Sequence, residues 1–494
     1  MLKRIEYKYI VAILAVFAIF MELLDSTVVN VAIPTLGRDF DVTSPTTIQW
    51  VITGYLLSLA VFIPVSGWAG DRFGTKRVFM FALAVFTFAS LLCALAWSIE
   101  SLIAFRVFQG VGGGMLSPVA FATVWRAFPP EERSKAAGIM VVPAAAAPAT
   151  GPLVGGLLLK YASWHWIFLV NIPIGIAALV ISALYLREHR EPSVGRFDPP
   201  GFVLSAVGLA MVVYALAEAG VRGFDDPRVI GFGLVGLVML AAFVFVELRS
   251  PAPMLDVRIF KNTLFRACNI AWLVTMFGFS STIFLLTLEL QANRGMSALE
   301  SGLTTFPMAV GVMIMAQPAS RIYRVAGPRR MILAGLIVTA LCTLVFWWVD
   351  LGTSEWVIRG LMLIRGLGFG LVLVPLQAAT YAGIEGKDTG RATALYNVTS
   401  QVAASLGVAL AATLLTSQLS RHHAILGAPQ ARAASLDAFQ DVFLVMGLIA
   451  AASVVVAFLI RDAHARATMR QLSSEERPPP SPGSATPAES GEPA

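Results

Sequence analysis

The sequence predicts an all-α polytopic membrane protein, and three observations support this fold class. Of its 494 residues, 57% are apolar and 13% are charged, against roughly 25% charged in a typical soluble protein. The mean hydropathy is +0.75. Apolar runs such as residues 78–97 continue without the alternation expected of a transmembrane β-barrel. Together these features argue against a soluble enzyme and against a barrel.

Fourteen helices are predicted, because fourteen apolar runs between charged, glycine and proline residues reach the roughly 20 residues needed to cross a bilayer. The first six lie at about 10–33, 46–69, 78–97, 101–124, 135–159 and 164–186. Two more follow at about 199–218 and 228–248. The last six lie at about 264–290, 300–320, 331–350, 355–383, 391–417 and 439–460.

These helices are expected to form two six-helix bundles with a two-helix insert. We assign residues 1–190 to the N-terminal bundle, 191–262 to the insert with its linkers, and 263–465 to the C-terminal bundle. Residues 466–494, rich in Pro, Ser, Glu and Gly, are expected to be a disordered cytoplasmic tail, since they hold too little apolar surface to fold. Residues 104–114 and 363–373 are weakly similar, since each segment has one arginine before glycines. Such an internal similarity is typical of transporters built from two halves.

The basic residues predict the orientation of the chain. With fourteen spans, 26 of the 36 Lys and Arg residues fall on the side of the N-terminus, 8 on the opposite side and 2 inside spans. Because cytoplasmic loops retain basic residues, both termini are expected in the cytoplasm. This membrane topology also accounts for the net charge of +6, so the charge does not indicate a nucleic-acid partner.

Two acids in the first span are the main candidates for chemistry. Glu22 and Asp25 are three residues apart, so they share one face of a helix within about one turn. Two close carboxylates repel in a low dielectric, which favours proton binding by one of them and suits a proton carrier. The alternative is that Glu22 lies near the membrane surface, or that either acid satisfies a backbone group.

Other polar residues inside spans are expected to join these acids. Arg106 needs a carboxylate, carbonyl or water, because an unpaired guanidinium in hydrocarbon is costly. It either tunes a nearby acid or forms a static buried ion pair. Arg365 is its counterpart in the second half, and Glu289 faces either substrate or the membrane surface. The predicted proton-coupling residues are Asp25, Glu22 and Arg106, and the predicted substrate cavity contains Asp25, Glu22, Asn30, Glu289, Arg365 and Gln109.

Two glycine-rich segments indicate close helix contacts. In GWAGDRFGTKRV the glycines permit a tight turn and the acid can face a helix N-terminus, which favours a gate formed by helix contacts. The alternative is a basic loop that only fixes the topology of the chain. The gate residues are Gly67, Asp71, Arg72, Gly74 and Arg77. The fifth span combines prolines with small residues that let another backbone approach, although such packing is common in membranes. Its marked positions are Gly138, Pro148, Gly151, Pro152, Gly155 and Gly156.

These segments together resemble the major facilitator superfamily, and specifically its fourteen-span drug:proton antiporter subgroup. GWAGDRFGTKRV is similar to the loop motif between the second and third helices, FRVFQGVGGG to the fourth-helix motif, and GPLVGG to the fifth-helix antiporter motif. LLDSTVVNVAIP, WHWIFLVNIPIG and FDPPGFVL resemble stretches characteristic of the fourteen-span subgroup, and GRATALYNVTSQVAASLGVAL extends the match to the second half.

The resemblance implies two bundles rocking about a central cavity, with Asp25 tied to proton coupling and Arg106 as the fourth-helix arginine. The family often has arginine where Ser400 stands, commonly has proline and tyrosine near Thr287 and Glu289, and lacks an acid at Glu22. A cavity with fewer cations and more acids would favour cationic lipophilic substrates.

The sequence thus predicts a multidrug efflux antiporter of the bacterial inner membrane, driven by the proton gradient and needing no cofactor. Cys93, Cys268 and Cys342 lie in apolar runs and indicate packing, not a metal site. We expect a monomer in the lipid bilayer; relatives in double-membrane bacteria often work with a periplasmic adaptor and an outer-membrane channel. A proton-coupled importer of a metabolite is the main alternative. A membrane enzyme is disfavoured because Asp225–Asp226 lacks a second acidic element, and a non-transporting sensor is a further alternative.

Overall fold

A computed structural model describes residues 6–42, 45–191, 197–250, 253–384, 388–426, 428–463 and 465. The predicted tail, residues 466–494, lies outside the described residues. Inside helices, the side chains at some positions, Asn30, Pro148 and Pro152 among them, are also outside the described part. Over the described ranges the chain is helical and contains no strand, which confirms the predicted all-α class.

The α-helices follow one another along the described chain with short connections. They are α1 (Tyr7–Asp39), α2 (Pro45–Phe73), α3 (Thr75–Ala94), α4 (Ile99–Ala127), α5 (Arg133–Tyr161), α6 (His165–Leu169), α7 (Asn171–Tyr185), α8 (Pro199–Arg222), α9 (Pro227–Arg249), α10 (Thr263–Leu288), α11 (Ala298–Thr305), α12 (Pro307–Ala326), α13 (Pro328–Val345), α14 (Glu355–Thr380), α15 (Thr389–Arg421) and α16 (Arg432–Ser453).

These helices supply the fourteen predicted spans. Among the described residues, thirteen helical segments are long and apolar enough to cross a membrane, with α6 and α7 forming one of them and α11 and α12 another. The fourteenth is α5, which has 29 residues, as many as α4, and no charged residue from Ala136 to Leu159. Most helices extend beyond the predicted apolar runs, because a helix continues into the polar interface as long as its backbone hydrogen bonds are made.

Local sequence explains where several helices begin. Ser98 and Ser101 form a reciprocal capping box at the start of α4, and Ser297 and Glu300 do the same for α11. Asn262 caps α10 through the backbone N–H groups of two residues. Each of these side chains satisfies amide groups that have no partner within the helix, which fixes the start of the element.

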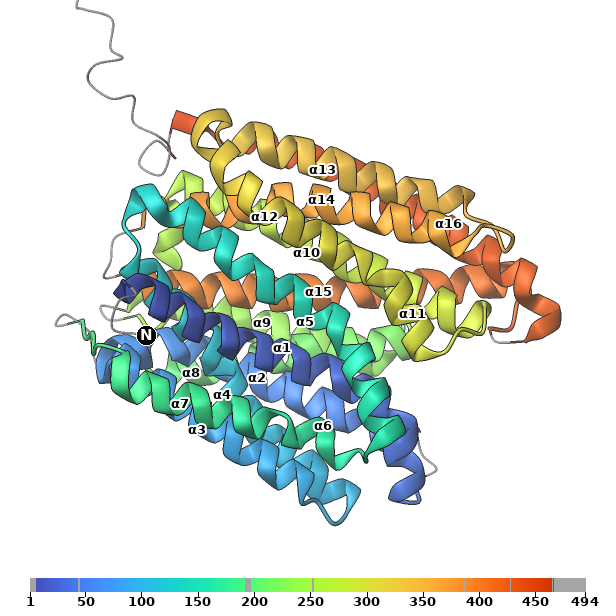
Figure 1. The fold of residues 1–494 in the computed structure, drawn as a ribbon, viewed down its shortest axis with the longest axis horizontal. Coiled ribbons are helices and arrows are strands. Elements are labelled where there is room, and N and C mark those ends of the chain that lie inside the picture. The colour runs from blue at the N-terminus through green and yellow to red at the C-terminus, as the bar shows by residue number, and fades with distance from the viewer. Residues whose placement is uncertain are drawn as a thin grey trace, which may run out of the picture.

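The helices form two halves joined across a central seam. In Figure 1 helices α1–α7 lie in the lower part and α10–α16 in the upper part, with α5 running between them beside α12. In the first half α4 packs on α2 and α3, and in the second half α14 packs on α12 and α13. The halves meet where α5 contacts α12 and α14, and where α15 contacts α2 and α4. The predicted domain boundaries themselves stay predictions.

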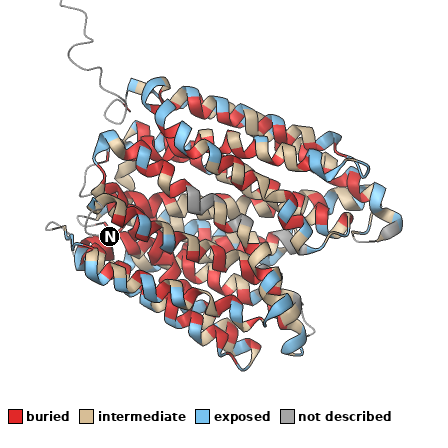
Figure 2. Ribbon diagram, in the orientation of Figure 1, coloured by how far each residue is buried: buried red, intermediate tan, exposed pale blue. Residues whose placement is uncertain are grey.

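The inserted pair lies at one side of this seam. Helix α8 packs against α9, α2 and α15, so it contacts both halves. Leu209 and Val213 of α8 are buried beside Ala60 of α2 and Val398 of α15. Helix α9 is mostly exposed, with 17% of its span buried inside the protein. Figure 2 shows the same pattern for the whole molecule, with buried positions along the inner helix faces and exposed positions on the periphery.

Candidate functional site

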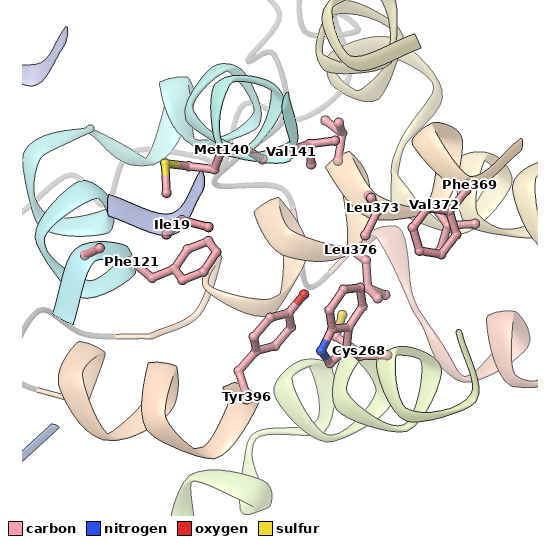
Figure 3. Close-up of a cluster of buried hydrophobic side chains, with 14 of the residues drawn as sticks. Ile19, Phe121, Met140, Val141, Cys268, Phe369, Val372, Leu373, Leu376 and Tyr396 are labelled. Carbon is pink, nitrogen blue, oxygen red and sulfur yellow. The ribbon is translucent and has the colours of Figure 1, made fainter. Parts of the chain in front are cut away.

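A cavity lies between the two halves in the middle of the helices. Its volume is about 260 Å³, and α1, α2 and α4 line it from one half while α10, α14 and α15 line it from the other. The wall is largely aromatic and aliphatic. Figure 3 shows Phe121 and Tyr396, one from each half, pointing toward the same space. A mainly apolar pocket with a few polar groups is typical of small-molecule sites.

Glu22 is the one charged side chain among the described residues that line this cavity. It is 7% exposed and accepts a hydrogen bond from the hydroxyl of Ser117 on α4. Among the described residues no other donor bonds to this carboxyl. A carboxylate with one neutral donor, in an apolar wall, is far less compensated than one that faces a cation.

Asp25 faces away from the cavity, into the interior of the first half. Its Oδ2 lies 2.5 Å from Nη1 of Arg106, and both side chains are completely buried. Its Oδ1 accepts from the amide of Gln109 at 3.1 Å and from the amide of Asn171 at 2.9 Å. Ser90 joins both amides, at 2.6 Å from Gln109 and 3.3 Å from Asn171. One hydrogen-bond network around this carboxylate thus joins four helices: α1, α3, α4 and α7.

Arg106 is held on its other sides by uncharged groups. Its Nε donates to the carbonyl of Val51 at 3.3 Å and its Nη1 donates to Gln109 at 2.7 Å. The guanidinium also lies over the ring of Tyr55, 4.1 Å from the centroid. Tyr55 lines the cavity as well, so this side chain contacts both the ion pair and the cavity. Its buried hydroxyl has no hydrogen-bond partner among the described residues.

The predicted gate residues lie where α2 meets the start of α15. A Cβ atom on Gly67 would lie 2.6 Å from the carbonyl oxygen of Gly390. Asp71 is 2.5 Å from Arg126 of α4 and also faces Gly390 at the N-terminal end of α15. A carboxylate there is favoured by the positive end of the helix dipole. This contact closes the end of the seam that carries the N-terminus.

Gly74 and Arg77, two further gate residues, lie at the turn between α2 and α3. Gly74 has a φ of +103°, a conformation that only glycine adopts readily. A Cβ atom there would clash with Glu188, which follows α7. Glu188 accepts from the backbone N–H of Lys76 at 3.1 Å, while Arg77, and likewise Arg72, is exposed. The turn is therefore fixed against the end of the first half.

More contacts close the same end of the seam. The ring of Trp125 on α4 stacks on Tyr381 after α14, with centroids 4.8 Å apart. Arg133, at the start of α5, donates to the backbone carbonyl of Tyr381. These contacts join the two halves on the N-terminal side of the cavity.

The glycines of α5 serve two different interfaces. A Cβ atom on Gly138 would lie 2.9 Å from the carbonyl oxygen of Ala316 on α12, across the seam. Gly151 faces Thr27 of α1, and Gly155 faces Val28. Nothing lies within 4 Å of a Cβ on Gly156, so packing in this conformation does not require that glycine. Predicted positions Pro148 and Pro152 have side chains outside the described part.

Of the five predicted cavity residues whose side chains the structure describes, Glu22 is the one in the cavity wall. Asp25 and Gln109 lie in the buried network behind Tyr55. Glu289 and Arg365 are not among the described residues that line this cavity. Glu289, beyond the end of α10, forms an ion pair with Arg294 at 2.7 Å. Arg365 is buried inside the second half, where it donates to the carbonyl of Gly278 at 3.1 Å. The side chain of Asn30 lies outside the described residues.

Three polar residues of the site were missed by the sequence-based prediction: Ser90, Ser117 and Asn171. Each lies inside an apolar helix, where a polar side chain needs a partner. Their position in apolar helices could therefore have identified these three residues as candidates. The sequence does not indicate which partner each side chain binds.

The described residues contain no group of three or more His, Cys, Asp or Glu side chains that could hold a metal ion. Cys93, Cys268 and Cys342 are buried and free.

Comparison with known proteins identifies the family. The family model described as Major Facilitator Superfamily matches residues 15–408. The chain belongs to the major facilitator superfamily. It is therefore a multi-pass membrane transporter and not an enzyme, and the predicted superfamily is confirmed.

Relatives and a solved structure agree with this membership. The chain is 36% identical over 414 residues to the multidrug resistance protein B homolog of Mycobacterium tuberculosis (strain ATCC 25618 / H37Rv), covering 83% of this chain and 76% of the relative. It is 33% identical over 405 residues to the uncharacterized MFS-type transporter YhcA of Bacillus subtilis (strain 168), covering 82% and 76%. The crystal structure of the human organic anion transporter MFSD10 (TETRAN) matches with a TM-score of 0.62 at 16% identity, covering 90% of this chain and 100% of that one.

Proposed function

We propose that this transporter is an antiporter that exports amphipathic small molecules from the cytoplasm in exchange for protons. The observation that carries the proposal is the ion pair of Asp25 and Arg106, buried directly behind the wall of a central cavity. A relative of 36% identity named as a multidrug resistance protein supports the substrate class.

Protonation of Asp25 is the step that would drive the cycle. A proton on the carboxyl removes the charge that attracts Arg106, while the Val51 carbonyl and Gln109 still hold the guanidinium. The two halves then separate at the end closed by Gly67 and Asp71, which opens the cavity to the cytoplasm. Substrate enters, Asp25 releases its proton there, and the protein closes again. An inward-moving proton gains about 2.3 kcal/mol per 100 mV of membrane potential.

The orientation and setting of the protein belong to the same proposal. The excess of basic residues on the side of the N-terminus supports cytoplasmic termini, and relatives from bacteria support the bacterial cytoplasmic membrane. We take the monomer as the working unit, because the cavity and the ion pair are complete within one chain.

Proteoliposomes test the proposal. The purified protein is reconstituted with a pH-sensitive dye inside, and a panel of amphipathic compounds is added under an imposed pH gradient. We expect at least one compound to move against the direction of proton flow, and Asp25→Asn to abolish that exchange while Asp39→Asn, an exposed acid on the same helix, leaves it intact. Co-directional movement of compound and proton would establish an importer instead. Normal exchange by Asp25→Asn would refute coupling through this acid.

A further inference from the structure

The two acids of α1 occupy separate compartments. Asp25 is enclosed by Arg106, Gln109 and Asn171, while Glu22 faces the cavity. Tyr55 contacts both compartments, because Arg106 lies over its ring at 4.1 Å and Tyr55 also lines the cavity. Of these two acids, Asp25 alone has a cationic partner among the described residues.

The surroundings of Glu22 favour binding of a positively charged ligand. No Lys, Arg or His side chain is among the described residues that line the cavity. A buried carboxylate without a cation is costly, and a bound organic cation would remove that cost.

Aromatic rings complete the site. Trp272 and Tyr396 stack with centroids 4.8 Å apart, and Phe279 and Phe369 stack at 4.6 Å; all four line the cavity. The face of an aromatic ring attracts a cation, and aromatic cages are known to bind quaternary ammonium groups. The buried hydroxyl of Tyr55, which has no partner within the described part of the chain, is a further group that a ligand could bind.

We propose that Glu22, with the aromatic wall of the central cavity, forms a binding site for a monovalent organic cation, a tertiary or quaternary amine carrying an apolar group. Asp25 keeps the separate task of carrying the proton. This division rests on the proposed export function and narrows its substrate class.

A pair of probes that differ in charge alone tests the site. Benzyltrimethylammonium is a compact aromatic cation, and neopentylbenzene is its uncharged counterpart with carbon in place of nitrogen. Binding of each labelled probe to the purified full-length protein is measured for the wild type, Glu22→Gln, Glu22→Asp and Asp39→Asn. Asp39 is an exposed acid on the same helix and serves as the matched control.

We expect the wild type to prefer the cation and Glu22→Gln to bind it roughly tenfold or more weakly, with little change for the neutral probe. Glu22→Asp should retain the preference, which separates loss of charge from loss of folding, and Asp39→Asn should match the wild type. Equal affinity of the wild type for both probes, or unchanged cation binding by Glu22→Gln, would overturn the assignment. If either result came with intact proton-driven export of other compounds, this inference alone would fail; absence of proton-driven export for the whole panel would instead refute the proposed function.

Discussion

Gly67 of α2 and Gly390 of α15 bring the two halves of the transporter into backbone contact. A Cβ atom on Gly67 would lie 2.6 Å from the Gly390 carbonyl oxygen, and a backbone atom cannot move aside as a flexible side chain would. The closed end of the seam therefore depends on the absence of a side chain at residue 67.

Substituting Gly67 should open that end. In Gly67→Val the halves must move apart, so a cysteine introduced at Gln401 in the cavity wall should react faster with a thiol reagent from the side of the N-terminus. Gly156→Val is the matched control, since no described residue lies within 4 Å of a Cβ atom added there. Equal labelling rates for Gly67→Val and the control would contradict this role for Gly67.

Removing Arg106 should destabilise the first half. Arg106→Ala leaves Asp25 buried without its cation, which we expect to cost about 3–5 kcal/mol of unfolding free energy. Arg106→Lys should recover only part of this loss, because one ammonium group cannot reach both Asp25 and the Val51 carbonyl as the guanidinium does.

Denaturant unfolding in detergent measures these differences. Arg77→Ala is the control, since the Arg77 side chain is 69% exposed and should change stability by less than about 0.5 kcal/mol. An Arg106→Ala protein as stable as the Arg77→Ala protein would show that the pair contributes nothing to folding.

Adding a methyl group at Gly151 should loosen the contact of α5 with α1. The new Cβ would clash with the side chain of Thr27, and we expect Gly151→Ala to cost about 1–3 kcal/mol. Combining it with Thr27→Ala removes the closest atom, Oγ1, and should restore part of the loss. Thermal unfolding of the two single variants and the double variant checks this; strictly additive losses would argue that the two residues do not contact each other.

Shortening Tyr55 should let protons reach Asp25 from the cavity without substrate. Tyr55→Ala removes a ring that contacts Arg106 and also lines the cavity, so vesicles containing it should lose an imposed pH gradient faster than wild-type vesicles. Tyr55→Phe keeps the ring and should hold the gradient as the wild type does. A Tyr55→Ala protein as tight as the wild type would show that another group forms the barrier.

Much of the fold could be predicted from sequence because its determinants are local. An apolar run of about 20 residues specifies a membrane helix without knowledge of its neighbours. The partner of Arg106 was also constrained, since a buried guanidinium requires a carboxylate, carbonyl or water, and Asp25 was one of few acids inside spans.

The different surroundings of Glu22 and Asp25 could not be predicted in the same way. Residues three apart on a helix differ by about 60° around its axis, so both acids share a face. Only the neighbouring helices decide that one meets Ser117 beside the cavity and the other meets Arg106. For the same reason the sequence left two alternatives open for Glu289, whose partner in the structure is Arg294, at the end of the short helical segment that follows α10.

The position of α8 makes the surrounding lipid part of the energetics of transport. This helix touches α2 and α15 at once, and the hydroxyl of Thr413 on α15 donates to the carbonyl of Ala219 on α8 at 3.0 Å. A relative motion of α2 and α15 would therefore change the contacts of α8, and through α8 the position of α9, whose mostly exposed apolar surface suits contact with lipid. Bilayer thickness would then affect the energy of such a motion.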